Sequence, residues 1–497
     1  MSAVGSILTN SGALNALNSI SNTTSRTSTL ENQLSTGLSI SSPADNPAGY
    51  ITAQGFTSQL NGITQAISNA NQGVSLLQTA QGAITQQIGV VQQLNSIAVQ
   101  AANGTQTSAE AQSLQGVVGQ LTAQVSTIAN QTQFNNISLL NGSFNGVQFQ
   151  VGANEGQTQT LSISNTTASH IGMYTSGVKS GGIYSTGSAA SSGVVTAGTA
   201  GAFTAGSLVV TGPTSGSASI SVKAAESAAS IAAAVNNAAG VTGVQAQATN
   251  TVTLNLKAAG ANGGYSFKIG ASTGSAAGSA VGKSVTVNAS NVSELVSQIN
   301  GQTTTNGITA STNSKGQLVL SQASGDNINI SAVSSGSLTT TAATPVAITG
   351  TATAPGAGAT IQGQVQFQSS AAFSVTAGAT TPGGIGLNNS STLQSLSNIN
   401  VSTTAGANQA INVVKYALAA LNNQGGQLGA VQQALTANIN NLNTTSQNVT
   451  SALGVVQDAN IPQVSNQLTE AQIQAQSGVA ALKSSTTLQQ SFLSLLP

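Results

Sequence analysis

Apolar residues recur at alternating steps of three and four near both ends of the chain, and this pattern constrains the fold more than any other feature. Between Leu60 and Ala98 the spacing predicts one long helix with a single apolar face. Between Ile411 and Val456 it predicts a second long helix, and a further helix follows towards the C-terminus. The positions expected to pack along these seams are Leu60, Ile63, Ile67, Val74, Leu77, Ile84, Ile88, Leu421, Leu428, Leu435, Ile439, Leu442, Leu453, Leu468, Val479 and Leu482.

Shorter helices accompany the long ones. A helix over Leu114 to Ile128 follows the turn signal Asn103-Gly104-Thr105, so it should return antiparallel to the long N-terminal helix. The terminal segments are rich in Asn, Ser, Thr, Gln and Gly, which are weak helix formers. Because such helices are marginal alone, we expect the chain ends to order fully only when they pack on partners.

The middle of the chain, from Asn165 to about Ser395, is dominated by Gly, Ser, Thr and Ala, and its apolar spacing shortens to two residues. This spacing predicts short strands with glycine-rich turns. An internal repeat is offset by 64 residues and pairs Ile231–Asn236 with Leu295–Asn300, Val244–Ala246 with Ile308–Ala310, and Leu254–Leu256 with Leu318–Leu320. Each repeat, at about 207–257 and 284–321, is expected to form a strand, a helix and two strands.

These patterns together predict an α+β fold. Both termini form a long antiparallel helical coiled-coil bundle, and a β-rich outer insertion contains two repeated small α/β units. Burial of each Leu or Ile side chain contributes about 1.5–3 kcal/mol. The two ends should therefore stabilise each other by packing together.

The composition argues against several classes of function. Nine basic residues balance nine acidic ones and only 4% of the chain is charged, so nucleic-acid binding is not expected. The chain has no cysteine and a single histidine, His170, so neither a zinc site, a catalytic triad nor a cofactor is expected. The N-terminal segment does not resemble a secretory signal peptide, and no segment is apolar enough to predict a membrane span.

Two weaker patterns could indicate a phosphate-binding or a catalytic site, but a structural role explains both better. Gly278–Ser284 is a near miss to a phosphate-binding loop, but Ala277 replaces the first glycine and a predicted strand follows instead of a helix. The isolated acids Asp45, Asp458 and Glu470 lack a partner carboxylate at helical spacing, so capping or solvation is expected of them. We therefore predict that the chain is not an enzyme.

Motifs at both ends of the chain resemble the bacterial flagellins. The resemblance covers roughly residues 1–165 and 396–497, and it includes the link between the first two helices, the long helix, a hairpin and the closing helix. The motifs are Leu34–Leu38, Ser42–Gly49, Asn69–Leu76, Ala98–Thr105, Gln131–Asn135, Leu139–Gly142, Phe149–Gly156, Leu468–Ile473 and Ser494–Leu496.

The resemblance implies a self-assembling subunit of the extracellular flagellar filament. Such subunits leave the cell unfolded through the flagellar export channel, fold beneath a filament cap, contact hook-associated proteins and bind an export chaperone at their C-terminal helices. By this resemblance the chain divides into five parts. They are an inner-tube helix (1–43), half of a helical bundle with a β-hairpin (44–165), a variable outer region (166–395), the other bundle half (396–456) and a second inner-tube helix (457–497).

One segment departs from the family pattern. In many flagellins the helix before the motif at Ala98 carries arginines that the flagellin-sensing Toll-like receptor recognises. Here the matching stretch, Gln92–Ile97, has no charged residue. Because Gln and Asn cannot replace the bidentate bonds of arginine, weak or absent activation of that receptor is expected.

Two alternative functions share the terminal helices. A hook–filament junction protein is one, although the hairpin motif at Phe149–Gly156 favours a filament subunit. A surface-displayed adhesin or hydrolase carried by the insertion is the other, and the absence of a plausible catalytic cluster argues against the hydrolase. Growth into long filaments would separate the first alternative from the main hypothesis.

Overall fold

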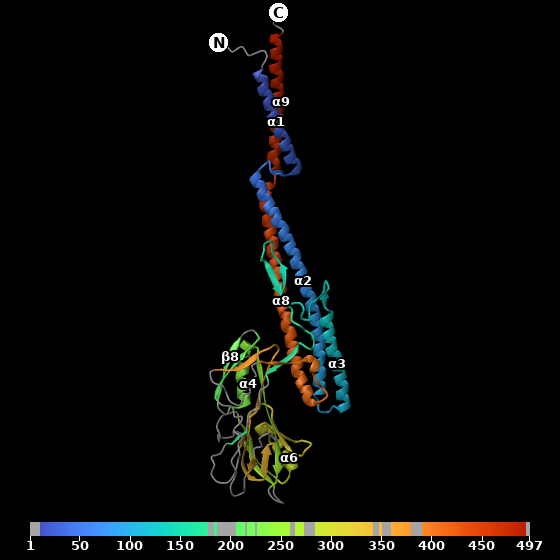
Figure 1. Cartoon of the computed structure of the whole chain (residues 1–497), viewed down its shortest axis with the longest axis vertical. Helices are drawn as coiled ribbons and strands as arrows, with labels where there is room; N and C mark the ends of the chain where they lie inside the picture. Colours follow the sequence, from blue (N-terminus) through green and yellow to red (C-terminus); the bar gives the residue numbers. More distant parts are fainter. Residues whose placement is uncertain are drawn as a thin grey trace. The chain divides into compact units, whose positions relative to one another are not determined.

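The computed structural model describes residues 10–176, 183–185, 205–213, 216–223, 226–258, 264–272, 284–340, 347–349, 359–378 and 390–493. Long helices occupy both ends of the chain, and short strands with small helices lie between them in the sequence (Figure 1). The predicted fold class, helical termini around a β-rich middle, is confirmed. The chain forms two compact units. Unit 1 comprises Met1–Thr79, Asn145–Ser162 and Leu428–Pro497, and unit 2 comprises Ala80–Phe144 and Ile163–Gln427.

Local sequence signals set the ends of the helices. α1 begins after Asn10, whose side chain accepts a hydrogen bond from the backbone N–H of Ala13, and ends at Gly37 in the left-handed region (φ 73°). α3 begins with a capping box between Thr107 and Glu110. The helices are α1 (Ser11–Thr36), α2 (Pro47–Ala101), α3 (Ser108–Gln131), α4 (Ala228–Asn237), α5 (Ala239–Thr242), α6 (Val292–Gly301), α7 (Thr303–Asn306), η1 (Leu396–Asn398), α8 (Thr404–Gln457) and α9 (Ile461–Leu493).

The strands form three sheets and two separate hairpins. The largest sheet has the order β12-β13-β9-β18-β5-β20 with β15 and β16 attached, the second has the order β11-β10-β14-β17-β6, and the third has the order β19-β7-β8. The strands are β1 (Gln133–Phe134), β2 (Ile137–Ser138), β3 (Val147–Gln150), β4 (Thr158–Leu161), β5 (Gly172–Ser176), β6 (Ile183–Ser185), β7 (Gly206–Thr211), β8 (Ser217–Val222), β9 (Gln245–Lys257), β10 (Tyr265–Ser272), β11 (Ser284–Ala289), β12 (Ile308–Thr312), β13 (Leu318–Gln322), β14 (Asn327–Ser335), β15 (Ser337–Thr340), β16 (Ala347–Thr349), β17 (Ala359–Ile361), β18 (Gln364–Ser369), β19 (Ser374–Ala377) and β20 (Thr392–Ser395).

In unit 1, α1 and α9 pair antiparallel. Asn10, before the start of α1, hydrogen-bonds with Ser485 near the end of α9. At the other end of the pair, the backbone N–H of Ala459 donates to the carbonyl oxygen of Gly37 at 2.9 Å. These two contacts fix the direction of the helices, as predicted for helices that come from opposite ends of the chain.

The hairpin β3-β4 lies on α2 within unit 1. The side chain of Asn69 donates to the carbonyl oxygen of Gln150 at 3.1 Å. A Cβ atom on Gly73 would lie 3.6 Å from Phe149, and one on Gly62 would lie 3.0 Å from Ala153. The absence of side chains at these two glycines therefore allows the hairpin to approach the helix closely.

In unit 2, buried amides tie the helices to the segments that enter and leave the β-rich region. Gln87 of α2 is fully buried, and its Nε2 donates to the carbonyl oxygens of Val125 in α3 (3.0 Å) and Thr166 (3.2 Å). Gln115 of α3 donates to the carbonyl oxygen of Ile399 (3.1 Å). Because buried polar groups are costly unless paired, these bonds specify where the connecting segments lie.

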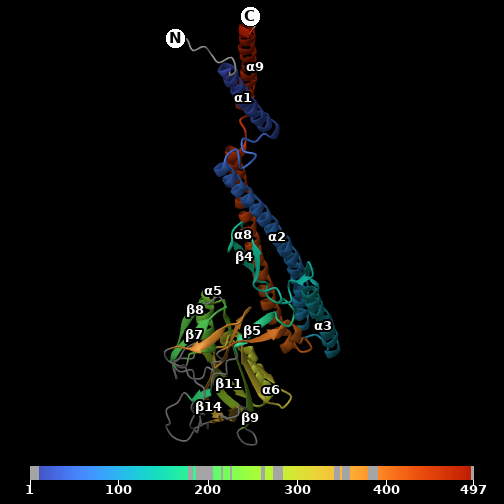
Figure 2. The ribbon, with the colours of Figure 1, turned by 45° about the horizontal axis from the view of Figure 1, so that its top comes forward.

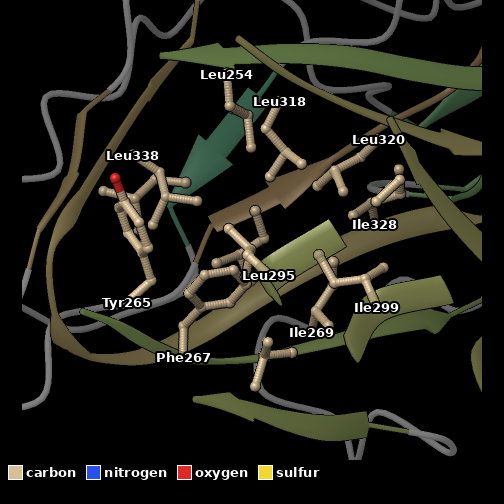
Figure 3. Packing of buried hydrophobic residues seen from close by; sticks show 14 of the residues in the cluster. Leu254, Tyr265, Phe267, Ile269, Leu295, Ile299, Leu318, Leu320, Ile328 and Leu338 are labelled. Atoms are coloured by element: carbon tan, nitrogen blue, oxygen red, sulfur yellow. The ribbon is translucent and has the colours of Figure 1, made fainter. Parts of the chain in front are cut away.

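Two apolar clusters make up the core of the β-rich region, and β9 contributes to both. Ala246 and Ala248 face a cluster with α4, β7, β8, β18 and β19. Val252 and Leu254 face a cluster with α6 and the strands β10 to β17. Figure 2 shows β7, β8 and α5 together, and α6 with β11 and β14 in a separate group. In the second cluster, the side chains of α6 lie among those of the surrounding strands (Figure 3).

The two segments predicted to be repeats differ from the expectation in two respects. In the first segment two strands, β7 and β8, precede the helices, where one was expected. Two strands, β12 and β13, follow the helices of the second segment, whereas β9 runs without interruption through the first. The predicted break between Ala246 and Leu254 is therefore wrong. The intervening residues alternate between exposed and buried without a glycine or proline, so nothing ends the strand.

Candidate polymerisation interface

The predicted seam positions differ in burial. The buried ones are Ile63, Leu77, Ile84, Leu421, Leu428, Leu435 and Leu442. The half-buried ones are Leu60, Ile67, Val74, Ile88, Ile439, Leu453, Leu468 and Leu482. Val479 on α9 is 54% exposed, so this side chain does not pack in the seam of the single chain.

The seam residues that the structure brings together lie on antiparallel partners. Ile63 and Ala66 of α2 cluster with Leu442 of α8 in unit 1, and Ile67 packs against the same cluster. A Cβ atom on Gly73 would approach Leu435 to 3.1 Å, so the two helices are close at that level. At these two levels, residues on the apolar stripe of α2 therefore lie against residues on the apolar stripe of α8.

The terminal pair of helices has a smaller apolar cluster. Leu30 of α1 packs with Val464 and Ala471 of α9, and the half-buried Leu468 lies against them. Gly478 allows α1 to approach, since a Cβ atom there would lie 2.9 Å from Ile20. Only one stripe of each terminal helix is covered, and the remaining surface stays open to solvent.

Large apolar side chains remain exposed on these helices. Among the described residues of α1 and α9 they are Leu14, Leu17, Leu34, Ile461, Ile473, Val479 and Leu488, with exposed fractions from 38% to 61%. In α2 and α8, Ile51 is 72% exposed and Val455 is 88% exposed. Leu14 and Leu17 lie one helical turn apart on α1, so a partner could cover both at once.

The same helices carry very little charge. α2 contains no Asp, Glu, Lys or Arg, and Lys415 is the single charged residue of α8. Many of their hydroxyls donate to the carbonyl oxygen four residues earlier, as Thr64 does to Leu60 (2.8 Å) and Thr436 does to Gln432 (2.9 Å). Such faces can be buried against another helix without the large cost of desolvating charges.

Several buried residues of these helices were not predicted from the sequence. Leu76, Val90 and Leu94 are buried in α2 next to the predicted stripe. In unit 2, α3 packs beside α2 through Gln87, so α2 has a second covered face there. A search for a single apolar stripe misses a helix with two partners, and it cannot identify a polar residue such as Gln87 as part of the core.

The residues considered for other chemistry do not form a site. The ring of His170 is exposed, and its Nδ1 lies 3.0 Å from the hydroxyls of Thr167 and Ser169. Asp45 accepts hydrogen bonds from the backbone N–H groups of Ser41 (3.0 Å) and Ser42 (2.8 Å) in the link after α1, and these bonds lower the pKa of its carboxyl. This differs slightly from the expected capping of the next helix, because Asp45 orders the preceding turn.

In the described part of the chain, no three His, Asp or Glu side chains lie close enough together to bind a metal ion. Of the near miss to a phosphate loop, residues 278–283 lie outside the described residues, and Ser284 begins β11, the strand expected after it. None of the helices in these same ranges is long and apolar enough to cross a membrane.

Comparison with known proteins identifies the family. The family models described as bacterial flagellin N-terminal helical region and bacterial flagellin C-terminal helical region match residues 7–145 and 411–496. The B-type flagellin of Pseudomonas aeruginosa is 33% identical over 504 residues, covering 98% of this chain and 99% of that one. The chain belongs to the bacterial flagellin family. Flagellins are structural subunits of the extracellular flagellar filament, so the paired terminal helices are those of a filament subunit.

Other known proteins are similar to this chain over shorter stretches or at low structural similarity. The phase 1 flagellin of Salmonella naestved is 36% identical over 167 residues, which is 34% of this chain and 33% of that flagellin. A structure of FliC from Burkholderia pseudomallei aligns with a TM-score of 0.30 at 20% identity, covering 73% of this chain and 99% of that one. FlgL from Xanthomonas campestris aligns with a TM-score of 0.30 at 12% identity, covering 80% and 98%.

Proposed function

We propose that this chain is exported unfolded through the flagellar channel and polymerises through its terminal helices into the filament that propels the cell. The observation that supports this most is the pair α1 and α9. Each helix of the pair buries one face against the other, and Leu14, Leu17 and Val479 remain exposed. Fully burying a Leu or Val side chain stabilises a contact by about 1.5–3 kcal/mol. Contact with neighbouring copies supplies that burial.

The proposed division of the chain follows from this role. Residues 1–43 and 457–497 line the inner tube, 44–165 and 396–456 form the surrounding bundle, and 166–395 face the outside. The low charge of α2 and α8 supports burial of the bundle helices between copies. The role is structural and requires neither a catalytic residue nor a cofactor.

Negative-stain electron microscopy of the purified chain after seeding or salting-out tests the proposal. Long uniform filaments are expected from the full chain, and none from a chain without residues 1–40. Short capped stubs would favour a hook–filament junction protein instead. A chain that stays monomeric in the presence of seeds would contradict polymerisation, and the displayed-adhesin alternative would then gain support.

Other flagellar proteins are the proposed partners. The growing filament meets the filament cap at one end and hook-associated proteins at the other. Before export, α9 binds a flagellin chaperone, and the exposed Ile473, Val479 and Leu488 support this because they offer an apolar surface. Titration of the chaperone into full-length chain and into a chain ending at residue 460 tests it. Equal affinity for both would exclude α9 as the binding segment.

Weak activation of the flagellin-sensing Toll-like receptor is also part of the proposal. Gln92, Gln93, Asn95 and Ser96 are exposed on α2, and Leu94 between them is buried. The exposed face of this turn therefore offers amides and a hydroxyl but no guanidinium group, which binds carboxylates with two parallel bonds. Reporter cells treated with purified, endotoxin-free protein should respond weakly, and a strong response would contradict the proposal.

A further inference from the structure

Two strands of the second core cluster lie at the ends of their sheets. Among the strands that the structure describes, β11 is the last of the five-stranded sheet and β12 is the last of the eight-stranded sheet. The outer side of such a strand presents backbone N–H and C=O groups that can pair with a strand of another molecule. α6 lies between β11 and β12 in the sequence and packs against both.

The outer side of β12 is occupied by side chains from α6 and α7. Asn300 donates from Nδ2 to the carbonyl oxygen of Ala310 (2.8 Å), and its Oδ1 accepts from the N–H of the same residue (2.7 Å). The N–H of Ile308 donates to Oδ1 of Asn306 (3.0 Å), and its carbonyl oxygen accepts from Oγ1 of Thr303 (2.9 Å). Ile308 and Ala310 are two residues apart, so they face the same edge of the strand.

The outer side of β11 has a matching contact. Gln298 of α6 donates from Nε2 to the carbonyl oxygen of Asn288 (2.6 Å), and its Oε1 accepts from the N–H of Asn288 (3.0 Å). A carboxamide presents one donor and one acceptor side by side, as a backbone peptide group does. Leu295 and Ile299 hold α6 in place because both are fully buried in the core cluster (Figure 3).

A third contact of this kind occurs 64 residues before the one at Asn300. Asn236 of α4 donates to the carbonyl oxygen of Ala246 (3.0 Å) and accepts from its N–H (2.8 Å). Thus the same pair of bonds, between the end of a helix and a strand ten residues later, occurs in both repeated segments. Because the contact occurs in both segments, it is a property of the repeated unit and not an accident of one loop.

We propose that Gln298 and Asn300 act in place of a neighbouring strand, closing the edges of β11 and β12 so that this region does not pair strand-to-strand with a second copy of the chain. We call these two pairs of hydrogen bonds, between Gln298 and Asn288 and between Asn300 and Ala310, the clamps. The clamps are properties of the single chain. Their importance for the filament rests on the proposed function, because polymerisation holds many copies of the insertion at high local concentration. The helices then remain the route by which copies assemble, and the sheets do not compete with them.

Hydrogen–deuterium exchange of the full-length monomer tests the clamps one at a time. Gln298→Ala should speed exchange in β11 and leave β12 unchanged, whereas Asn300→Ala should do the reverse. Loss of a pair of hydrogen bonds predicts at least about tenfold faster exchange at the clamped amide. Each variant is the control for the other, and Ser297→Ala, at an exposed position on the same helix, should change neither strand. Unchanged exchange at Asn288 and Ala310 would overturn the proposal.

Association of the double variant tests the consequence. Gln298→Ala combined with Asn300→Ala should form dimers or larger species that bind thioflavin T and show intermolecular β-sheet in the infrared spectrum, while the unaltered chain does not. Asn300→Asp should stay monomeric, since a charge at the edge still blocks pairing. A double variant that remains monomeric with opened edges would overturn the proposal. Loss of filament growth in the unaltered chain would contradict the proposed function and leave both exchange results valid.

Discussion

The phenol of Tyr416 in α8 donates a hydrogen bond to Oε1 of Gln245 at the start of β9, with a distance of 3.0 Å. The bond joins the C-terminal bundle helix to the largest sheet within unit 2. Burial raises the pKa of Tyr416 to about 12, because the charged phenolate is poorly solvated there. The neighbouring Asn412 side chain also approaches Gln247 of β9 at 3.4 Å, so helix and strand are joined without any charged group.

Removal of the Tyr416 hydroxyl should weaken this junction. Tyr416→Phe keeps the ring and leaves Gln245 without its donor, so the free energy of unfolding of unit 2 should fall by about 1 kcal/mol. In an alkaline titration of tyrosine absorbance, the step near pH 12 should disappear from the variant. The raised pKa also predicts that this contribution to stability is present below about pH 10 and is lost as the pH rises from 10 to 12. An unchanged titration curve would show that another tyrosine is the buried one.

The buried amide of Gln87 should contribute strongly to the stability of the helical part of unit 2. Gln87→Ala removes the donor to the carbonyl oxygens of Val125 and Thr166, and it also leaves a cavity. We expect a loss of about 2–4 kcal/mol in urea unfolding. Gln86→Ala, at the exposed neighbouring position, should change the free energy of unfolding by less than about 0.5 kcal/mol. Equal effects of the two variants would contradict the assigned role.

The link between α1 and α2 should loosen in acid through Asp45. Hydrogen bonds from Ser42 and then Ser41 lower the pKa of the Asp45 carboxyl below its usual value of 3.8. A lowered pKa means that the stabilisation is present above the unfolded pKa and is lost as the pH falls through the folded value. Asp45→Asn should therefore speed hydrogen exchange in residues 41–46 near neutral pH, and the difference from the unaltered chain should vanish in strong acid. Glu31→Gln, at an exposed position on α1, should leave this segment unchanged at either pH.

The sequence identified the buried residues of a helix only where a single apolar spacing marks its one buried face. Ile63 of α2 packs with Leu442 of α8, and both lie on apolar stripes that a regular spacing marks in the sequence, because one stripe facing one partner leaves a regular period. Gln87 was missed, since it is polar and faces a second partner of α2, the helix α3. Val479 was also expected to pack along a seam, but its side chain on α9 is exposed in the single chain.

The β-rich region was harder to predict in detail. The internal repeat in the sequence pairs two segments, but it could not show that β9 is continuous or that two different core clusters share it. The pairing of β9 with β13, β15 and β18 depends on residues up to about 120 positions away. Asn236 and Asn300 were matched by the repeat, yet their bonds to Ala246 and Ala310 follow only from the structure.

The critical concentration for seeded polymerisation tests the central claim most directly. Leu14 and Leu17 are three residues apart on α1 and more than half exposed, so replacing both by Ser should leave the monomer folded. If copies bury these side chains, the critical concentration should rise by at least about tenfold, which corresponds to about 1.4 kcal/mol. Thr24→Ala, at an exposed position on the same helix, should have little effect. A double variant that polymerises at the concentration of the unaltered chain would contradict assembly through the exposed face of α1.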